Sequence, residues 1–103
     1  MVKWEGLQVN QDTGIPFACP NYATKSIQVV GTFGGATLTI EGSNMIDTPA
    51  YAPQVDNLEE AIEFTSEGIK QIFSNTYWIR PRISSGAGAT TNLSVYLVAH
   101  TTR

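Results

Sequence analysis

Hydrophobic and polar residues alternate along much of the chain, as is typical of β-strands with one buried face. In residues 25–33 the apolar side chains share one parity, and residues 37–41 repeat this pattern. The Gly34-Gly35 pair between them supplies the positive φ angles that a two-residue hairpin turn requires. We therefore predict an antiparallel hairpin over residues 25–42. Its predicted inward-facing residues are Ile27, Val29, Phe33, Leu38 and Ile40.

A second pair of alternating segments lies near the C-terminal end of the sequence. Residues 76–83 and 93–99 alternate in the same way, and a loop of small residues at 84–91 separates them. We predict a second hairpin over residues 76–99. Because Pro81 cannot donate a ladder hydrogen bond, we expect its strand to be an edge strand or to carry a bulge there.

Residues 56–75 are compatible with two structures. Apolar residues recur there at helical spacing, which indicates an amphipathic helix. The alternative is a short strand at 61–65, a turn at 66–68 and one helical turn at 69–73. We favour the alternative, because Gly68 and several β-branched residues disfavour a helix.

The remaining segments complete an all-β pattern. We expect a first strand near residues 2–9 and an extended connection over residues 10–22, which contain glycine and two prolines. Six to eight short strands with at most one short helix predict an antiparallel β-sandwich of jelly-roll type. The length of 103 residues fits a single domain, 1–103.

The composition describes a polar but weakly charged surface. Charged residues make up 15% of the chain, whereas about 25% is usual. Uncharged polar residues are twice as numerous, with 12 Thr, 7 Ser, 6 Asn and 5 Gln. The net charge is −3 and no basic run is present, so we expect no nucleic-acid partner. No apolar stretch approaches the roughly 20 residues of a membrane span, so we expect no membrane partner.

Residues that could catalyse a reaction are few and separated, so we expect no enzyme and no catalytic, cofactor or metal site. His100, the single histidine, has no catalytic neighbour in the sequence and is interpreted as a surface residue. Cys19, the single cysteine, has no neighbouring cation and is interpreted as a buried apolar residue. The acidic residues within 56–67 lack the spacing of a calcium loop. We interpret them as a solvated face, or else as a patch that docks onto a basic partner.

The predicted strand at residues 76–83 carries the most informative set of candidate functional residues. In a regular strand, Trp78, Arg80 and Arg82 project from one face, and Trp and Arg are enriched at protein interfaces. We take these three residues and Tyr96 as the candidate interface. Two alternatives remain. Trp78 could belong to the core while the arginines pair with glutamates, or the exposed aromatics Tyr51, Trp78 and Tyr96 could bind a sugar.

Two runs of sequence resemble segments of small structural proteins of tailed bacteriophages. They are residues 28–44 (QVVGTFGGATLTIEGSN) and residues 77–83 (YWIRPRI), the second followed by a Gly/Thr loop and a terminal strand. The similarity covers about residues 24–100. After Asn44 the usual Asp-Gly and Trp are missing and residues 45–51 (MIDTPAY) stand in their place, so we expect that loop to have its own shape.

The resemblance implies a virion protein, assembled in the host cytoplasm, that decorates or cements a capsid. The implied partners are the major capsid protein or another virion protein, and further copies of the chain around a symmetry axis, with a trimer favoured. On this hypothesis the strand with Pro81 and the face with Trp78, Arg80 and Arg82 meet a neighbouring subunit. The alternatives are a tail, neck or host-adsorption component, and a carbohydrate-binding jelly-roll module.

Overall fold

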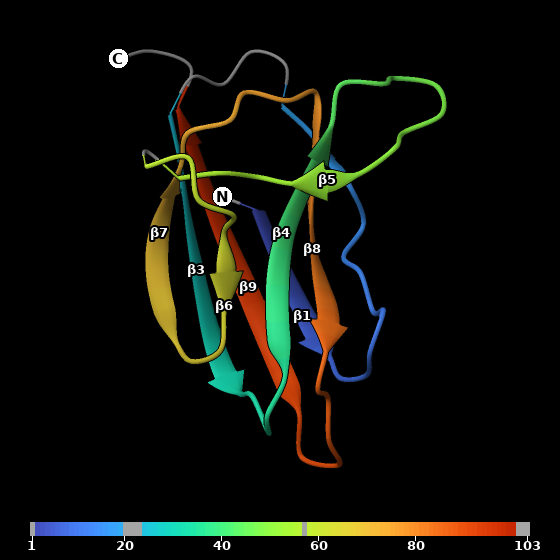
Figure 1. Cartoon of the computed structure of the whole chain (residues 1–103), viewed down its shortest axis with the longest axis vertical. Coiled ribbons are helices and arrows are strands. Elements are labelled where there is room, and N and C mark those ends of the chain that lie inside the picture. The colour runs from blue at the N-terminus through green and yellow to red at the C-terminus, as the bar shows by residue number, and fades with distance from the viewer. Residues whose placement is uncertain (1, 20–23, 57, 101–103) are drawn as a thin grey trace.

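The expected all-β fold is confirmed. The computed structural model describes residues 2–19, 24–56 and 58–100, which form nine β-strands and no helix (Figure 1). This is one strand more than the six to eight expected, and three of the nine have only two residues. The strands are β1 (Val2–Leu7), β2 (Phe17–Ala18), β3 (Thr24–Thr32), β4 (Thr37–Ser43), β5 (Ala52–Pro53), β6 (Glu63–Phe64), β7 (Gly68–Ile72), β8 (Trp78–Ser85) and β9 (Asn92–His100).

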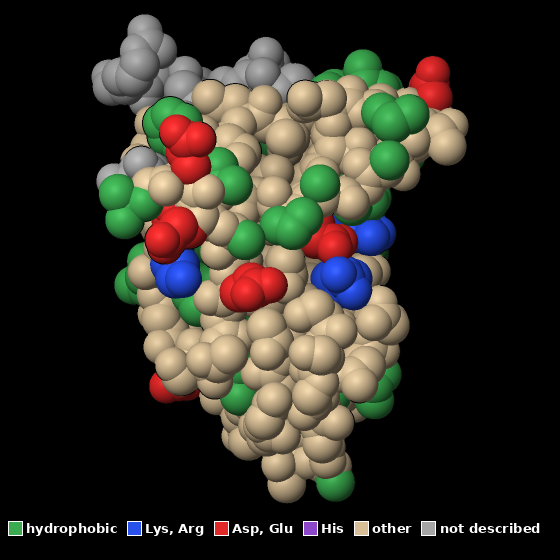
Figure 2. Space-filling view, in the orientation of Figure 1, with side chains coloured by type: hydrophobic (Ala, Val, Ile, Leu, Met, Phe, Trp, Pro, Cys, Tyr) green, Lys and Arg blue, Asp and Glu red, His purple; other side chains and the backbone are tan. Residues whose placement is uncertain are grey.

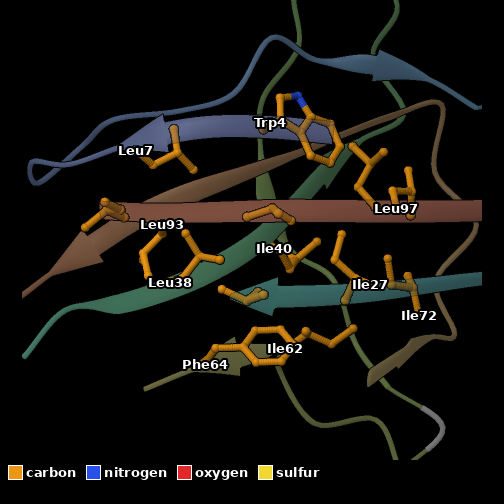
Figure 3. Close-up of a cluster of buried hydrophobic side chains, with 14 of the residues drawn as sticks. Trp4, Leu7, Ile27, Leu38, Ile40, Ile62, Phe64, Ile72, Leu93 and Leu97 are labelled. Atoms are coloured by element: carbon orange, nitrogen blue, oxygen red, sulfur yellow. The ribbon is translucent and has the colours of Figure 1, made fainter. Parts of the chain in front are cut away.

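The strands form two antiparallel sheets that face each other. Sheet A has the order β1-β9-β3-β7, and sheet B has the order β2-β8-β4, with β5 and β6 both pairing with the far side of β4. One hydrophobic core fills the space between the sheets (Figure 3). Its fully buried residues include Ile27, Val29, Leu38, Ile40, Ile62, Ile79, Ile83, Leu93, Val95 and Leu97. The predicted inward-facing residues of segments 25–33 and 37–41 are all buried.

Both predicted hairpins are wrong in their pairing, although their strands exist. β3 pairs with β7 and β9 in sheet A, whereas β4 pairs with β5, β6 and β8 in sheet B. Each predicted hairpin is therefore an arch that crosses from one sheet to the other. Alternation specifies which side chains face the core, but two strands that face each other across the core alternate just as two hydrogen-bonded neighbours do.

The tips of the two arches are locked together. The Thr91 hydroxyl, which is buried in the second arch, donates a 2.7 Å hydrogen bond to the Phe33 carbonyl of the first arch. A Cβ atom on Gly86 would lie 2.3 Å from the Gly35 carbonyl oxygen, so only glycine permits this approach of the two backbones. This contact fixes the two sheets relative to each other at one end of the sandwich.

The segment 56–75 contains no helix in its described residues, so the helix interpretation is wrong. The favoured alternative correctly placed a strand, β6, before a bend at 65–67, but its helical turn at 69–73 is also wrong. These residues form β7, which extends sheet A by pairing with β3 over Lys25–Val29. The side of β3 that β9 leaves unpaired offers backbone hydrogen bonds to this segment, and β-branched Ile69 and Ile72 suit a strand.

β8 is not an edge strand, and its irregularity is not at Pro81. β4 pairs with one side of β8, while β2 and the segment around Gly14 cover the other. The ladder partner of Pro81 on β4 is Ile40. The Ile40 N–H donates to the Ile62 carbonyl, and the Ile40 carbonyl accepts from the Gln54 N–H, both on the side of β4 away from β8. Ile40 therefore needs no N–H from Pro81. The register shift lies instead between Thr37 and Leu38.

The N-terminal predictions are close to the structure. A first strand is confirmed as β1, which is an edge of sheet A. Within the connection 10–22, β2 pairs with β8, while residues 20–22 lie outside the described residues. Where the structure describes the chain, it has no helix of the length and apolar character needed to cross a membrane.

Candidate interaction surfaces

The outer face of sheet B carries three of the four candidate interface residues. On β8, Trp78, Arg80 and Arg82 alternate with the buried residues of that strand and therefore lie on one face. Their cross-strand neighbours on β4 are Ser43, Glu41 and Thr39, respectively. Acidic and basic side chains gather over these strands (Figure 2).

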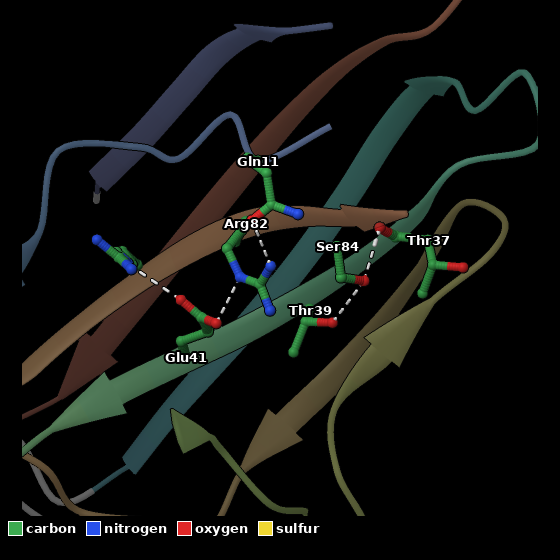
Figure 4. Close-up of polar contacts among 7 residues, drawn as sticks. Gln11, Thr37, Thr39, Glu41, Arg82 and Ser84 are labelled. Carbon is green, nitrogen blue, oxygen red and sulfur yellow. Dashed lines mark hydrogen bonds and ion pairs between the residues drawn. The ribbon is translucent and has the colours of Figure 1, made fainter. Parts of the chain in front are cut away.

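Glu41 links the two arginines. Its carboxylate accepts hydrogen bonds from Arg80 Nε at 3.1 Å and from Arg82 Nε at 2.6 Å (Figure 4). Arg82 also donates from Nη1 to the Gln11 side chain at 2.8 Å, which ties the N-terminal connection to the cluster. Glu41 is only 5% exposed. Such a buried carboxylate requires partners, and charge-assisted bonds from two guanidinium groups supply them.

One aromatic ring packs against this ion-paired group, and two more meet at Tyr77 and Trp78. The Arg80 guanidinium lies over the Tyr51 ring, 3.7 Å from its centroid, where the ring electrons attract the cation. Trp78 is half-buried, donates from Nε1 to the Ile46 carbonyl at 3.3 Å, and meets the edge of Tyr77. The alternative interpretation of the arginines and Trp78 is therefore right in pairing the arginines with a glutamate, but it is wrong in placing Trp78 in the core. We call Glu41, Tyr51, Trp78, Arg80 and Arg82 the sheet B cluster.

The charge of the sheet B cluster differs in sign from that of the chain. Its two arginines and one glutamate leave one net positive charge, on a chain whose formal net charge is −3. The cluster combines a cation with aromatic and half-buried groups held by several hydrogen bonds. Chemically, it fits a partner surface that offers a carboxylate beside an apolar patch.

Tyr96, the fourth candidate residue, lies on the opposite side of the molecule. It is on β9, where it alternates with the buried Val95 and Leu97 and so points outward from sheet A. Its cross-strand neighbours are Lys3 and Gln28. The structure therefore does not bring Tyr96 together with Trp78. For the same reason, the aromatics proposed for sugar binding do not form one platform.

The outer face of sheet A carries no Asp, Glu, Lys or Arg among its outward residues on β7, β3 and β9. Its outward residues are Thr24, Ser26, Gln28 and Val30 on β3, Ile69 and Gln71 on β7, and Ser94, Tyr96, Val98 and His100 on β9. Ile69 is 63% exposed and Val98 is 41% exposed. The one ion pair near this face, between Lys3 and Glu5, lies on the neighbouring β1 edge, within the part of the chain that is described.

A buried lysine near Cys19 is absent from the sequence-based candidates. Lys25 is fully buried and donates from Nζ to the Asn75 side chain at 2.9 Å. Burial lowers the pKa of Lys25, and its interaction with Cys19 opposes that change. Burial raises the pKa of the Cys19 thiol, and Lys25 partly offsets this rise. Lys25 shares the parity of Ile27, which was the available signal for its burial.

The other candidate residues have structural or solvent-exposed positions. His100 is exposed at the end of β9, and Cys19 is buried, as interpreted from the sequence. The Asp56 carboxylate accepts hydrogen bonds from the backbone N–H groups of Leu58 and Glu60, so it organises its own turn. Across the described ranges, no group of three or more His, Cys, Asp or Glu side chains is arranged to hold a metal ion.

Comparisons of the chain with protein-family models, with curated proteins and with solved structures found no match in any of the three.

Proposed function

We propose that this chain is a non-enzymatic virion structural protein, a capsid decoration protein that binds the assembled head and stabilises it. The observation that carries the proposal is the sheet B cluster. The two runs that resemble phage structural proteins, residues 28–44 and 77–83, contain Glu41 and the Trp78–Arg82 face, respectively. Their β4 and β8 parts pair with each other in sheet B, whereas residues 28–32 lie on β3 in sheet A. Part of each resembling run therefore contributes to the sheet B cluster.

The cluster has the properties of a docking surface that is formed before binding. Glu41 holds both guanidinium groups, and Tyr51 supports Arg80 from one side. Side chains that are already ordered lose little conformational entropy when a partner arrives. We propose that the partner is the major capsid protein, or another virion protein, through an acidic and partly apolar surface.

Stabilisation of the head follows from selective binding. A ligand that binds an assembled shell but not its free subunits shifts the equilibrium towards the shell, by mass action. Many copies of a small domain can act in this way without any chemical step. A tail or neck component could use the same surface, and it would differ in its number of copies per particle.

Binding of the purified chain to undecorated particles tests the proposal. We expect Trp78→Ala to weaken binding at least about tenfold, because truncation of a central aromatic anchor costs more than about 1.4 kcal/mol of binding free energy. The matched control is Tyr96→Ala, on the opposite face, which should bind as the unchanged chain does. Circular dichroism establishes that both variants are folded.

Unchanged binding by folded Trp78→Ala would contradict the assignment to sheet B. Loss of binding by Tyr96→Ala alone would move the docking surface to sheet A. No binding by the unchanged chain would contradict the decoration function itself.

A further inference from the structure

The loop between β4 and β5 adjoins the sheet B cluster. This projecting loop, residues 44–51, extends outward from the end of β4 before the chain returns as β5 (Figure 1). Near its start, the Ile46 carbonyl accepts a hydrogen bond from Trp78 Nε1 at 3.3 Å. Its last residue, Tyr51, packs against the Arg80 guanidinium. The projecting loop is therefore joined to the sheet B cluster near both of its ends, and the two form one continuous surface.

Several hydrogen bonds hold the projecting loop in one shape. The Ser43 hydroxyl accepts bonds from the backbone N–H groups of Met45 and Ala50, both at 3.1 Å. The Asn44 side chain accepts a bond from the Tyr77 backbone N–H at 3.2 Å. The side chains of the loop are thus presented by an ordered backbone, which reduces the entropy that is lost on binding.

The projecting loop adds an apolar part to this surface. Met45 and Ile46 are adjacent in the chain, and they are 53% and 55% exposed. Hydrophobic side chains of the loop lie on the same face of the molecule as the basic side chains of sheet B (Figure 2). Large apolar side chains that are exposed together beside polar groups are typical of a surface that contacts a protein partner.

The charges on the two parts of the surface have opposite signs. Arg80 donates only from Nε, to Glu41, so neither of its terminal Nη groups bonds to another described residue. The Arg80 side chain is 24% exposed, and a guanidinium with free Nη groups can take a further carboxylate. Asp47 on the loop is exposed and has no ion-pair partner within the described part of the chain. The surface therefore offers a cation in the cluster, and apolar side chains and an anion on the loop.

We propose that the projecting loop determines which partner the sheet B cluster accepts. The partner is a protein surface that places a carboxylate against Arg80 and an apolar hollow around Met45 and Ile46. It also offers a basic side chain to Asp47. This inference rests on the proposed function, since the partner is the virion protein that the chain is proposed to bind.

The sequence of the loop supports a role in specificity. Residues 45–51 are the place where the chain departs from the phage segments that it otherwise resembles, whereas Glu41, Arg80 and Arg82 lie within the resembling runs. A surface that shares its charged centre with related proteins can distinguish partners through the groups at its margin, by favourable contacts with one partner and by clashes with others.

Binding of the purified chain to undecorated particles tests the apolar part of the loop. Met45→Ser with Ile46→Ser should weaken binding at least about tenfold, because two exposed apolar side chains no longer fill the hollow. The matched control is Ile69→Ser on β7 of sheet A, where Ile69 is 63% exposed. The control should bind as the unchanged chain does.

A charge reversal tests the polar part of the loop. Asp47→Lys should weaken binding roughly tenfold, because it replaces an attraction to a basic side chain with a repulsion. Glu5→Lys makes the same change of net charge on β1 of sheet A, where the Glu5 side chain is 59% exposed, and it should leave binding unchanged. All four substituted positions are exposed, and circular dichroism establishes that the variants are folded.

The outcomes separate this inference from the proposed function. If the unchanged chain binds and Trp78→Ala weakens binding, then unaltered binding by the Met45/Ile46 variant would overturn the role of the loop alone. Equal effects of Asp47→Lys and Glu5→Lys would also overturn it, because they would report net charge rather than a contact of the loop. No binding by the unchanged chain would contradict both the inference and the decoration function.

Discussion

The two outer faces of the sandwich use polar residues in opposite ways. On sheet B, Thr39 and Glu41 are 2% and 5% exposed, and each is bonded to a side chain of β8. On sheet A, Ser26 and Gln28 occupy equivalent alternate positions on β3, but they are exposed and make no side-chain hydrogen bond to another described residue. Polar residues of one face are therefore bonded across the sheet, whereas those of the other are exposed and make no such bond.

The difference originates in what covers each central strand. β4 is buried along both faces. Long side chains of β8 lie over its outward-facing polar residues, and β5 and β6 pair along its other edge. A polar group covered in this way must find a partner or destabilise the fold. β3 lies between two strands whose outward side chains are short or uncharged, so its polar residues Ser26 and Gln28 stay exposed.

The largest difference in stability between substitutions on the two outer faces is expected at Glu41. Glu41→Gln keeps the shape of the side chain but leaves two guanidinium groups facing each other without a carboxylate. Breaking a fully buried ion pair costs about 3–5 kcal/mol. Because the arginine side chains are 24% and 27% exposed, we expect a smaller loss, about 2 kcal/mol of unfolding free energy.

Urea unfolding measures this loss, and exposed Glu63 on β6 provides the control. Glu63→Gln should change the stability by less than about 0.5 kcal/mol. Equal stabilities for the two variants would show that Glu41 does not support sheet B.

A smaller effect should appear between the two arginines. Arg80→Ala and Arg82→Ala should each cost about 1 kcal/mol, because the remaining arginine still compensates Glu41. The double variant leaves that carboxylate without either partner, so its loss should exceed the sum of the single losses by at least about 0.5 kcal/mol. A double-mutant cycle by urea unfolding gives this coupling, and strictly additive losses would contradict the shared role of Glu41.

The smallest effect is expected on sheet A. Ser26→Lys and Gln28→Lys place charges on the outer face of sheet A, where both side chains are exposed. Each should change the unfolding free energy by less than about 0.5 kcal/mol. Losses above about 1 kcal/mol in the same urea experiment would show that sheet A also depends on its polar residues.

Local burial could be predicted from the sequence, but the choice of strand partner could not. The inward positions of Ile27 and Ile40 follow from alternation, which reports burial residue by residue. Alternation is the same for strands that pair in one sheet and for strands that face each other across a core. The turn at Gly34-Gly35 therefore predicted a hairpin, although the strands leave it in different sheets.

The candidate site was affected by the same ambiguity. The sequence alone could place Trp78, Arg80 and Arg82 on one face, because in any regular strand alternate side chains share a face. The partner Glu41 could not be chosen, since a cross-strand pair depends on register between distant segments. Grouping Tyr96 with these residues requires β8 and β9 to share a sheet, and they do not.

The number of copies of this chain per purified virus particle tests the proposed function most directly. Quantitative mass spectrometry against the major capsid protein gives that number. The decoration function predicts a ratio near one to one, or a simple fraction such as one third. A few to a few tens of copies would assign the chain to the tail or neck, and absence from the particle would contradict a virion function.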